Sequence, residues 1–176
     1  MLTLAIDAGQ CSGWARSDGA SGTLDLTRYI SQKSPECDHG RACHEFLRWL
    51  VGMTHGDECN RIVTEQAVFT GRKSLAGLTQ AMLHLVYMRR SVCGIEHGEA
   101  TAGQWRKWLL GYGCISTKVE PSKARRDRMM DAAVMAAVRA RGFDPATEHA
   151  ADAAGLLLYD AARLRGEVSE TKRKAA

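Results

Sequence analysis

The 176-residue sequence lacks any apolar run that approaches the roughly 20 residues of a membrane-spanning helix. No basic and apolar leader precedes its first apolar segment, so a secretory signal is not expected. The six cysteines are scattered and form no C-x-x-C pair, which is typical of reduced thiols and not of a disulfide framework. These absences favour a cytoplasmic protein, and 45% hydrophobic with 25% charged residues suits a globular domain.

Internal repeats and a linker that would divide the chain are also lacking. We expect residues 1–166 to form one domain and the polar residues 167–176 to form a C-terminal tail. Residues of zinc-ligand type cluster at Cys37, His39, Cys43 and His44, with His55 and Cys59 further on, but their spacing fits no usual structural zinc site. Whether this cluster binds anything stays open.

Charge is unevenly distributed along the sequence. Residues 101–141 carry nine Lys and Arg against three acidic residues, which is about +6 in a chain of net charge +4, so the remainder carries about −2. A basic block on an acidic body suggests a polyanionic partner, although a solvated helix face would give the same pattern.

Apolar periodicity and turn residues predict five strands and five helices. The predicted strands are Leu2–Asp7, Gly13–Ser17, Thr23–Ile30, Arg61–Gln66 and Ser91–Glu96, and the first three form an antiparallel meander. The predicted helices are Arg41–Val51, Ser74–Met88, Gly103–Leu110, Ser122–Arg139 and Glu148–Leu164. Strands that alternate with helices after a meander indicate an α/β fold with a mixed sheet flanked by helices.

Three acidic residues lie in apolar settings. Asp7 and Glu65 each end a predicted strand, and Asp152 lies on a helix face of small residues with His149 and Glu148 three and four positions before it. Buried carboxylates that converge stay ionised only if a cation neutralises them, and such an oxygen-rich site suits Mg²⁺ or Mn²⁺. From the residues alone, three unrelated acids at helix caps or on the surface remain an alternative.

Four segments together carry a resemblance to a known family. The stretch "LAIDAGQCSGWA" resembles the D-x-G-x3-G-W opening of RuvC-type Holliday-junction resolvases in the RNase H-like superfamily. "IVTEQAVF", "GYGCISTK" and "AAVRARGFDPATEHAADAAGLLLYDAA" resemble three further motifs of that family, in the same order along the chain. The sequence looks especially like phage-encoded members. Glycines in the first motif are expected to let the chain turn sharply into the second strand.

The resemblance implies an RNase H-like domain with a mixed five-stranded sheet and a metal-dependent nuclease site. Residue by residue, the metal-binding and catalytic set becomes Asp7, Glu65, His149 and Asp152, with Glu148 as a rival for the His149 position. Asp7 would bridge two Mg²⁺ ions, for which Mn²⁺ would substitute, and two ions a few Å apart cleave phosphodiesters by in-line attack. The expected location is the cytoplasm of a bacterium or of a phage-infected cell.

The resemblance also implies a surface that binds branched DNA. Lys118 stands at the lysine position of the third motif, and Phe69 is either a base-stacking residue or a core residue. The expected DNA-binding residues are Lys118, Lys123, Arg125, Arg126, Arg128, Phe69, Arg72 and Lys73.

The implied function is resolution of four-way DNA junctions by paired nicks, as expected of an enzyme in recombination and repair. Paired nicks need two sites, so we expect a homodimer. Its interface is predicted on Ser74–Met88, where Leu75, Leu78, Met82 and Leu85 would face the sheet. A second apolar stripe, Ala76, Leu83 and Val86, would face the partner chain. The alternative function is a catalytically silent, or flap- and fork-directed, nucleic-acid-binding protein on the same fold.

Overall fold

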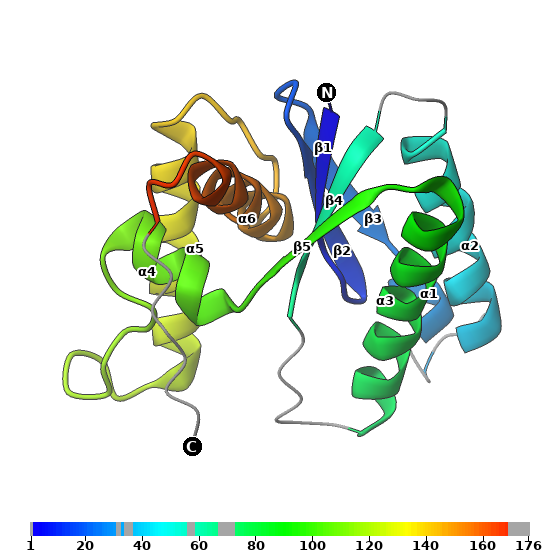
Figure 1. Ribbon diagram of the computed structural model, residues 1–176. Coiled ribbons are helices and arrows are strands. Elements are labelled where there is room, and N and C mark those ends of the chain that lie inside the picture. The colour runs from blue at the N-terminus through cyan, green and yellow to red at the C-terminus, as the bar shows by residue number, and fades with distance from the viewer. Residues whose placement is uncertain (1, 31–32, 34–36, 56–58, 67–72, 169–176) are drawn as a thin grey trace, which may run out of the picture.

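A computed structural model describes residues 2–30, 33, 37–55, 59–66 and 73–168, apart from the side chains of residues 73–75. Over these ranges the chain forms three layers, with a central sheet between two layers of helices (Figure 1).

The sheet of the described residues has five strands in the order β3-β2-β1-β4-β5. Their bounds are β1 Leu2–Asp7, β2 Cys11–Arg16, β3 Ser21–Asp25, β4 Cys59–Glu65 and β5 Glu96–Ala100. β1, β2 and β3 form an antiparallel meander, whereas β1 pairs in parallel with β4, and β4 in parallel with β5. The predicted meander and the mixed sheet are confirmed.

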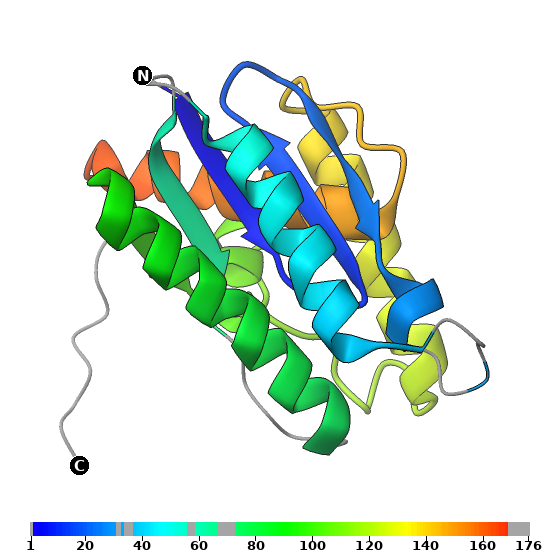
Figure 2. The ribbon, with the colours of Figure 1, turned by 90° about the vertical axis from the view of Figure 1, so that its right-hand side faces the viewer.

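Helices cover both faces of this sheet. Their bounds are α1 Thr27–Ile30, α2 His39–Met53, α3 Lys73–Cys93, α4 Ala102–Leu110, α5 Lys123–Arg139 and α6 Glu148–Leu164. α2 and α3 lie side by side over one face (Figure 2), and α4, α5 and α6 group over the other (Figure 1). Among the described helices, none is long and apolar enough to cross a membrane.

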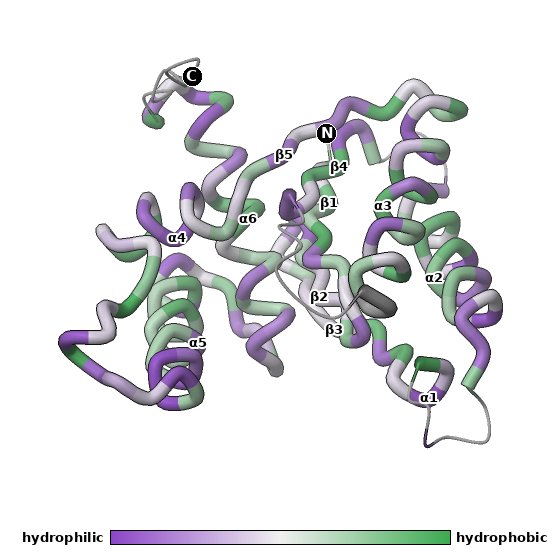
Figure 3. Tube along the Cα trace, turned by 90° about the horizontal axis from the view of Figure 1, so that it is seen from below, coloured by the Kyte–Doolittle hydropathy of each residue, from purple (hydrophilic) through white to green (hydrophobic). Residues whose placement is uncertain are grey.

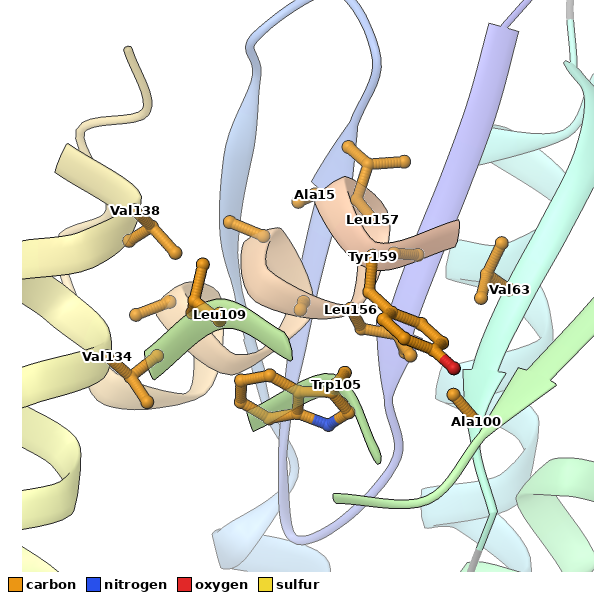
Figure 4. Close-up of a cluster of buried hydrophobic side chains, with 14 of the residues drawn as sticks. Ala15, Val63, Ala100, Trp105, Leu109, Val134, Val138, Leu156, Leu157 and Tyr159 are labelled. Carbon is orange, nitrogen blue, oxygen red and sulfur yellow. The ribbon is translucent and has the colours of Figure 1, made fainter. Parts of the chain in front are cut away.

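The sheet divides the core into two parts. Because successive side chains of a strand point to opposite faces, Leu4 and Ile6 pack towards α2 and α3, whereas Ala5 between them packs towards α6. The α6 side is built largely from small residues of β1, β2 and α6, together with larger side chains at its rim (Figure 4). Small residues on both surfaces let α6 lie close to the sheet, which brings its first turn near the ends of the strands.

Two predicted strands were placed wrongly. The strand predicted at Thr23–Ile30 ends at Asp25, and α1 follows it. Asp25 stops the strand because its carboxylate accepts hydrogen bonds from the backbone N–H and the hydroxyl of Thr27, at 2.8 and 2.6 Å. Such a side-chain bond to the next turn starts a helix and competes with continued strand pairing.

The strand predicted at Ser91–Glu96 begins only at Glu96, because α3 continues to Cys93. β5 carries little apolar sequence, since its buried Gly98 faces charged groups: a Cβ atom there would lie 2.6 Å from Arg61 and 2.7 Å from Asp160. Arg61 of β4 donates two hydrogen bonds to Asp160 of α6, at 2.7 and 3.0 Å, and both side chains are buried. A strand built over an ion pair does not show the apolar alternation from which strands are predicted.

The prediction that the second apolar stripe of α3 is free to face a partner chain is also wrong for its larger side chains. Val86 is fully buried within the chain, in the same core cluster as Leu78 and Met82, and Leu83 is also buried. Leu83 and Val86 of the second apolar stripe are therefore used by the fold of a single chain, whereas Ala76 is only partly buried. Within the described ranges, the exposed large apolar side chains of α3 are Met88 and Val92, further towards its end.

Candidate active site

Asp7 and Glu65 end neighbouring parallel strands. Ile6 of β1 pairs with Thr64 of β4, so the two acidic residues that follow lie at the same edge of the sheet. The carboxyl ends of parallel strands are a usual place for the functional groups of α/β proteins. The sequence-predicted placement of these two acids at strand ends is confirmed.

α6 brings its first turns against this edge. The Thr147 side chain caps the helix by accepting a hydrogen bond from the backbone N–H of Ala150 at 3.1 Å, and its hydroxyl lies 2.5 Å from the hydroxyl of Thr23 on β3. His149 Nδ1 then lies 3.7 Å from the Asp7 carboxylate. Glu148, the rival for this position, is exposed.

Gly13 makes this approach possible. It pairs with Asp7 across β1 and β2, and a Cβ atom on it would lie 1.8 Å from the backbone oxygen of His149. The chain does turn sharply here, with three residues between β1 and β2, but neither Gly9 nor Gly13 has a positive φ. Gly13 is required for space between β2 and α6.

The electrostatics of the cluster are those of crowded carboxylates. Burial and then the charge of Asp7 raise the pKa of Glu65 to about 7. Burial also raises the pKa of Asp152 to about 6, with Arg106 opposing the rise and Asp7 adding to it. The contact with Asp7 raises the pKa of His149, although burial opposes this rise. Burial first, and the charges of neighbouring carboxylates second, therefore disfavour the ionised forms of Glu65 and Asp152.

Two neighbouring residues of α4 each contact one of these carboxylates. Trp105 donates a hydrogen bond from its indole nitrogen to Glu65 Oε2 at 2.8 Å. Arg106 forms an ion pair with Asp152, with Nη2 2.8 Å from Oδ2, and its guanidinium carbon lies 5.0 Å from the centre of the Trp105 ring. Among the described residues, the Nε of Arg106 is the buried side-chain polar atom without a hydrogen-bond partner.

The chemistry of the four side chains fits a divalent metal. Carboxylate oxygens with one imidazole are donors that Mg²⁺ and Mn²⁺ accept, and the raised pKa values indicate a need for positive charge. In the metal-free chain, however, no three Asp, Glu, His or Cys side chains in the described ranges are arranged to hold a metal ion. Asp152 is instead neutralised by Arg106.

The predicted basic residues from Lys118 to Arg128 lie on the loop before α5 and on its first turns, where Figure 3 shows hydrophilic residues at the end of α5 nearest the viewer. Lys118 and Arg128 are exposed. Lys123 pairs with Asp127 at 2.8 Å, and Arg125 lies 3.8 Å from Glu120. These exposed pairs are weak and leave the basic groups available to other anions.

Arg126 is used differently. Its Nη1 donates to the backbone oxygens of Glu120 and Pro121, both at 2.7 Å, so it holds the loop that precedes α5. Asp131, further along α5, lies close enough to the acidic cluster to interact with it electrostatically. Burial raises its pKa, the charge of Glu148 adds to the rise, and Asp131 in turn raises the pKa of Asp152.

Three predicted DNA-binding residues lie outside the described part. These are Phe69 and Arg72, together with the side chain of Lys73 at the start of α3.

Sequence reasoning missed the roles of Trp105 and Arg106. The sequence places Arg106 only within the basic block of residues 101–141 and indicates no role for Trp105. Neither contact leaves a local signal, because the partners are 40 and 46 residues away along the chain.

No protein-family model matches this chain, and no curated protein matches it by sequence. A solved structure described as "Thermus thermophilus RuvC structure" matches with a TM-score of 0.66 and 19% identity, over 95% of this chain and 97% of that one. The fold is that of RuvC.

A second solved structure, "T. thermophilus RuvC in complex with Holliday junction substrate", matches with a TM-score of 0.65 and 14% identity. It covers 94% of this chain and 96% of the RuvC chain. Both matches confirm the expected RNase H-like fold with its five-stranded mixed sheet. The expected closeness to phage-encoded members has no support from them.

Proposed function

We propose that this chain is a structure-selective endonuclease that resolves four-way DNA junctions by paired, divalent-metal-dependent nicks. The observation that carries the proposal is the placement of Asp7 and Glu65 at one edge of a sheet with the RuvC fold, with His149 3.7 Å from Asp7. Asp152 lies close enough for the charge of Asp7 to raise its pKa. A solved relative in fold is described in complex with a Holliday junction substrate, which supports branched DNA as the partner.

Asp7, Glu65, His149 and Asp152 would hold the metal, taken as two Mg²⁺ ions for which Mn²⁺ substitutes. When bound, the ions would activate the attacking water and stabilise the leaving 3′ oxygen of the phosphodiester. The chain itself contributes position, because Gly13 and the Thr147 cap set His149 beside Asp7. Arg106 supplies positive charge to Asp152 in the metal-free chain.

DNA phosphates would lie along the loop before α5 and its first turns. Lys118, Lys123, Arg125 and Arg128 present their charges there, and Asp131 on the same helix couples electrostatically to the acidic cluster. A backbone-binding surface of this kind fits a partner recognised by its shape and charge.

The direct test compares cleavage of a four-way junction, a fork and a linear duplex in Mg²⁺. We expect paired nicks in the junction and little cleavage of the duplex. Asp7→Asn should abolish cleavage and leave junction binding within about twofold, because it removes a metal ligand and no phosphate contact. Cleavage by the Asp7 variant at the wild-type rate would show that the site is assigned wrongly.

Asp18→Asn is the matched control. Asp18 lies in the turn after β2. The residue before it, Ser17, donates a backbone hydrogen bond to Thr3 near the start of β1, so Asp18 lies at the opposite end of β1 from Asp7. The same neutralisation there should leave cleavage unchanged.

A catalytically silent protein that binds branched DNA is the second candidate. The observation that favours it is the ion pair between Arg106 and Asp152, which neutralises one predicted ligand without a metal. Tight junction binding with no cleavage in either Mg²⁺ or Mn²⁺ would select this candidate.

A further inference from the structure

Trp105 combines complete burial with a polar contact at the acidic cluster. Its ring lies in the core beneath α6, and its indole nitrogen reaches Glu65 Oε2 at 2.8 Å. Figure 4 shows the benzene half of the ring towards Val134 and Leu109 and the nitrogen on the opposite side. The buried indole N–H therefore finds its partner in the carboxylate and not in the backbone.

The position of the ring is fixed by its surroundings. Gly155 of α6 leaves the space that it fills, because a Cβ atom there would lie 2.7 Å from Cζ3 of the indole. Leu109, one turn later on α4, closes the same space, since its Cδ2 lies 3.4 Å from the same Cβ position. A ring held in this way cannot turn without disturbing the helix packing.

The start of α4 is fixed as well. Thr101 and Gln104 form a reciprocal capping box at its N-terminus, directly after β5. The backbone N–H of Gln66 donates to the oxygen of Ala100 at 2.8 Å, which ties the residue after Glu65 to the end of β5. The donor and the acceptor of the Trp105–Glu65 bond thus stand on two segments that are joined beside it.

We propose that Trp105 is a positioning residue for the metal site, whose N–H holds the Glu65 carboxylate in the orientation that binds the ion. This inference rests on the proposed function, because it takes Glu65 as a ligand. The bond uses one lone pair of Oε2, so rotation of the carboxylate away from its position would break the bond. Outer hydrogen bonds that orient ligands are typically worth about 10–100-fold in metal affinity or activity.

The test measures the affinity of the chain for Mn²⁺ by isothermal titration calorimetry, without DNA. Trp105→Phe keeps an aromatic ring and removes the N–H, and we expect about 10–100-fold weaker binding. Trp108→Phe is the matched control, because Trp108 lies on the same helix and packs edge-on against Tyr159 at 6.0 Å between ring centres. It should bind Mn²⁺ as the wild type does.

A second variant separates the hydrogen bond from packing. Benzothienylalanine, introduced at position 105 by stop-codon suppression, keeps the shape of tryptophan and replaces N–H by sulfur. We expect it to melt near the wild-type temperature and still to bind Mn²⁺ at least about tenfold more weakly. Its cleavage of a junction should show a lower kcat with an unchanged KM for DNA.

The outcomes distinguish this inference from the function on which it rests. If the wild type binds Mn²⁺ and the benzothienylalanine variant binds it equally well, the role of Trp105 is overturned and the metal site stands. If the wild type binds no Mn²⁺, the metal site is wrong and the role of Trp105 falls with it.

Discussion

Glu65 is the residue at which burial and charge conflict most directly. It is partly buried beside Asp7, and its pKa of about 7 lies well above the ordinary value of 4.5. A carboxyl whose pKa is raised by folding contributes stability below its unfolded pKa and loses that contribution as the pH rises through the folded pKa. Glu65 therefore destabilises the metal-free chain between about pH 4.5 and pH 7, increasingly towards the upper end.

Replacing this charge should stabilise the metal-free chain at high pH. We expect Glu65→Gln to raise the free energy of unfolding at pH 8 by on the order of 3 kcal/mol, at about 1.4 kcal/mol per pKa unit, and to change it little at pH 4.5. Urea unfolding in EDTA at the two pH values measures both quantities. Part of the pH dependence should survive in the variant, because Asp152 and His149 also have raised pKa values.

Glu45→Gln on α2 is the control for this experiment. Glu45 pairs with Arg48 on the helix surface at 2.8 Å, on the other side of the sheet from α6. Its variant should follow the wild type at both pH values. If Glu65→Gln also follows the wild type at both pH values, the charge on Glu65 does not destabilise the metal-free chain.

At the scale of residues, the sequence predicted where the acidic residues lie on their strands and helix, but not which side chains contact them. Asp7 and Glu65 could be placed because each follows a recognisable apolar strand, and His149 because it shares a helix face with Asp152. The contacts of Trp105 and Arg106 depend on how α4 packs against β4 and α6, which no local pattern contains. Short polar contacts of this kind become visible only in three dimensions.

At the scale of elements, α6 was the most predictable part of the chain. Its bounds are those predicted, Glu148–Leu164, because a threonine cap precedes a long run of helix-forming residues. β5 was the least predictable element, since its Glu96 pairs with Arg61 and most of its side chains do not form an apolar layer. Prediction failed where tertiary contacts had replaced the hydrophobic pattern.

α5 is the element on which DNA affinity should depend. Replacing one true phosphate contact should flatten the slope of log affinity against log salt by about one unit. We expect this for Arg128→Gln, whose side chain is exposed on the first turns of the helix. Arg126→Gln should instead lower the melting temperature with a smaller effect on the slope, because Arg126 is bound to backbone oxygens.

Arg139→Gln supplies the comparison for α5. Arg139 lies at the far end of the helix, with its Nε 3.4 Å from Asp144. Fluorescence anisotropy with a labelled junction at several salt concentrations measures the slope, and the slope for Arg139→Gln should equal the wild-type value. An unchanged slope for Arg128→Gln as well would make the start of α5 an ordinary solvated helix face.

At the scale of the whole molecule, α6 brings His149 and Asp152 to the sheet edge that carries Asp7 and Glu65, because the helix is fixed at both ends. Thr147 contacts Thr23 of β3 at its start, and Asp160 pairs with Arg61 of β4 near its end. The helix therefore spans the sheet from β3 to β4, with His149 and Asp152 at the end that faces Asp7. The acidic cluster depends on the packing of the whole domain and not on one loop.

One such domain offers one acidic cluster among its described residues, while paired nicks in a junction need two. We therefore expect a two-fold homodimer in solution, which light scattering at micromolar concentration measures directly. A stable monomer that still makes paired symmetric nicks would rule the dimer out.

The surface of α3 decides which variants test this dimer. Val86→Lys should lower the free energy of unfolding by about 3 kcal/mol or more, because it places a charge in the core of a single chain. Met88→Lys and Val92→Lys change side chains that are 64% and 82% exposed, so each should leave the fold intact. If the dimer uses α3, these two variants should give folded monomers that nick one strand without its partner. If both remain dimers with paired nicks, the interface lies on another element.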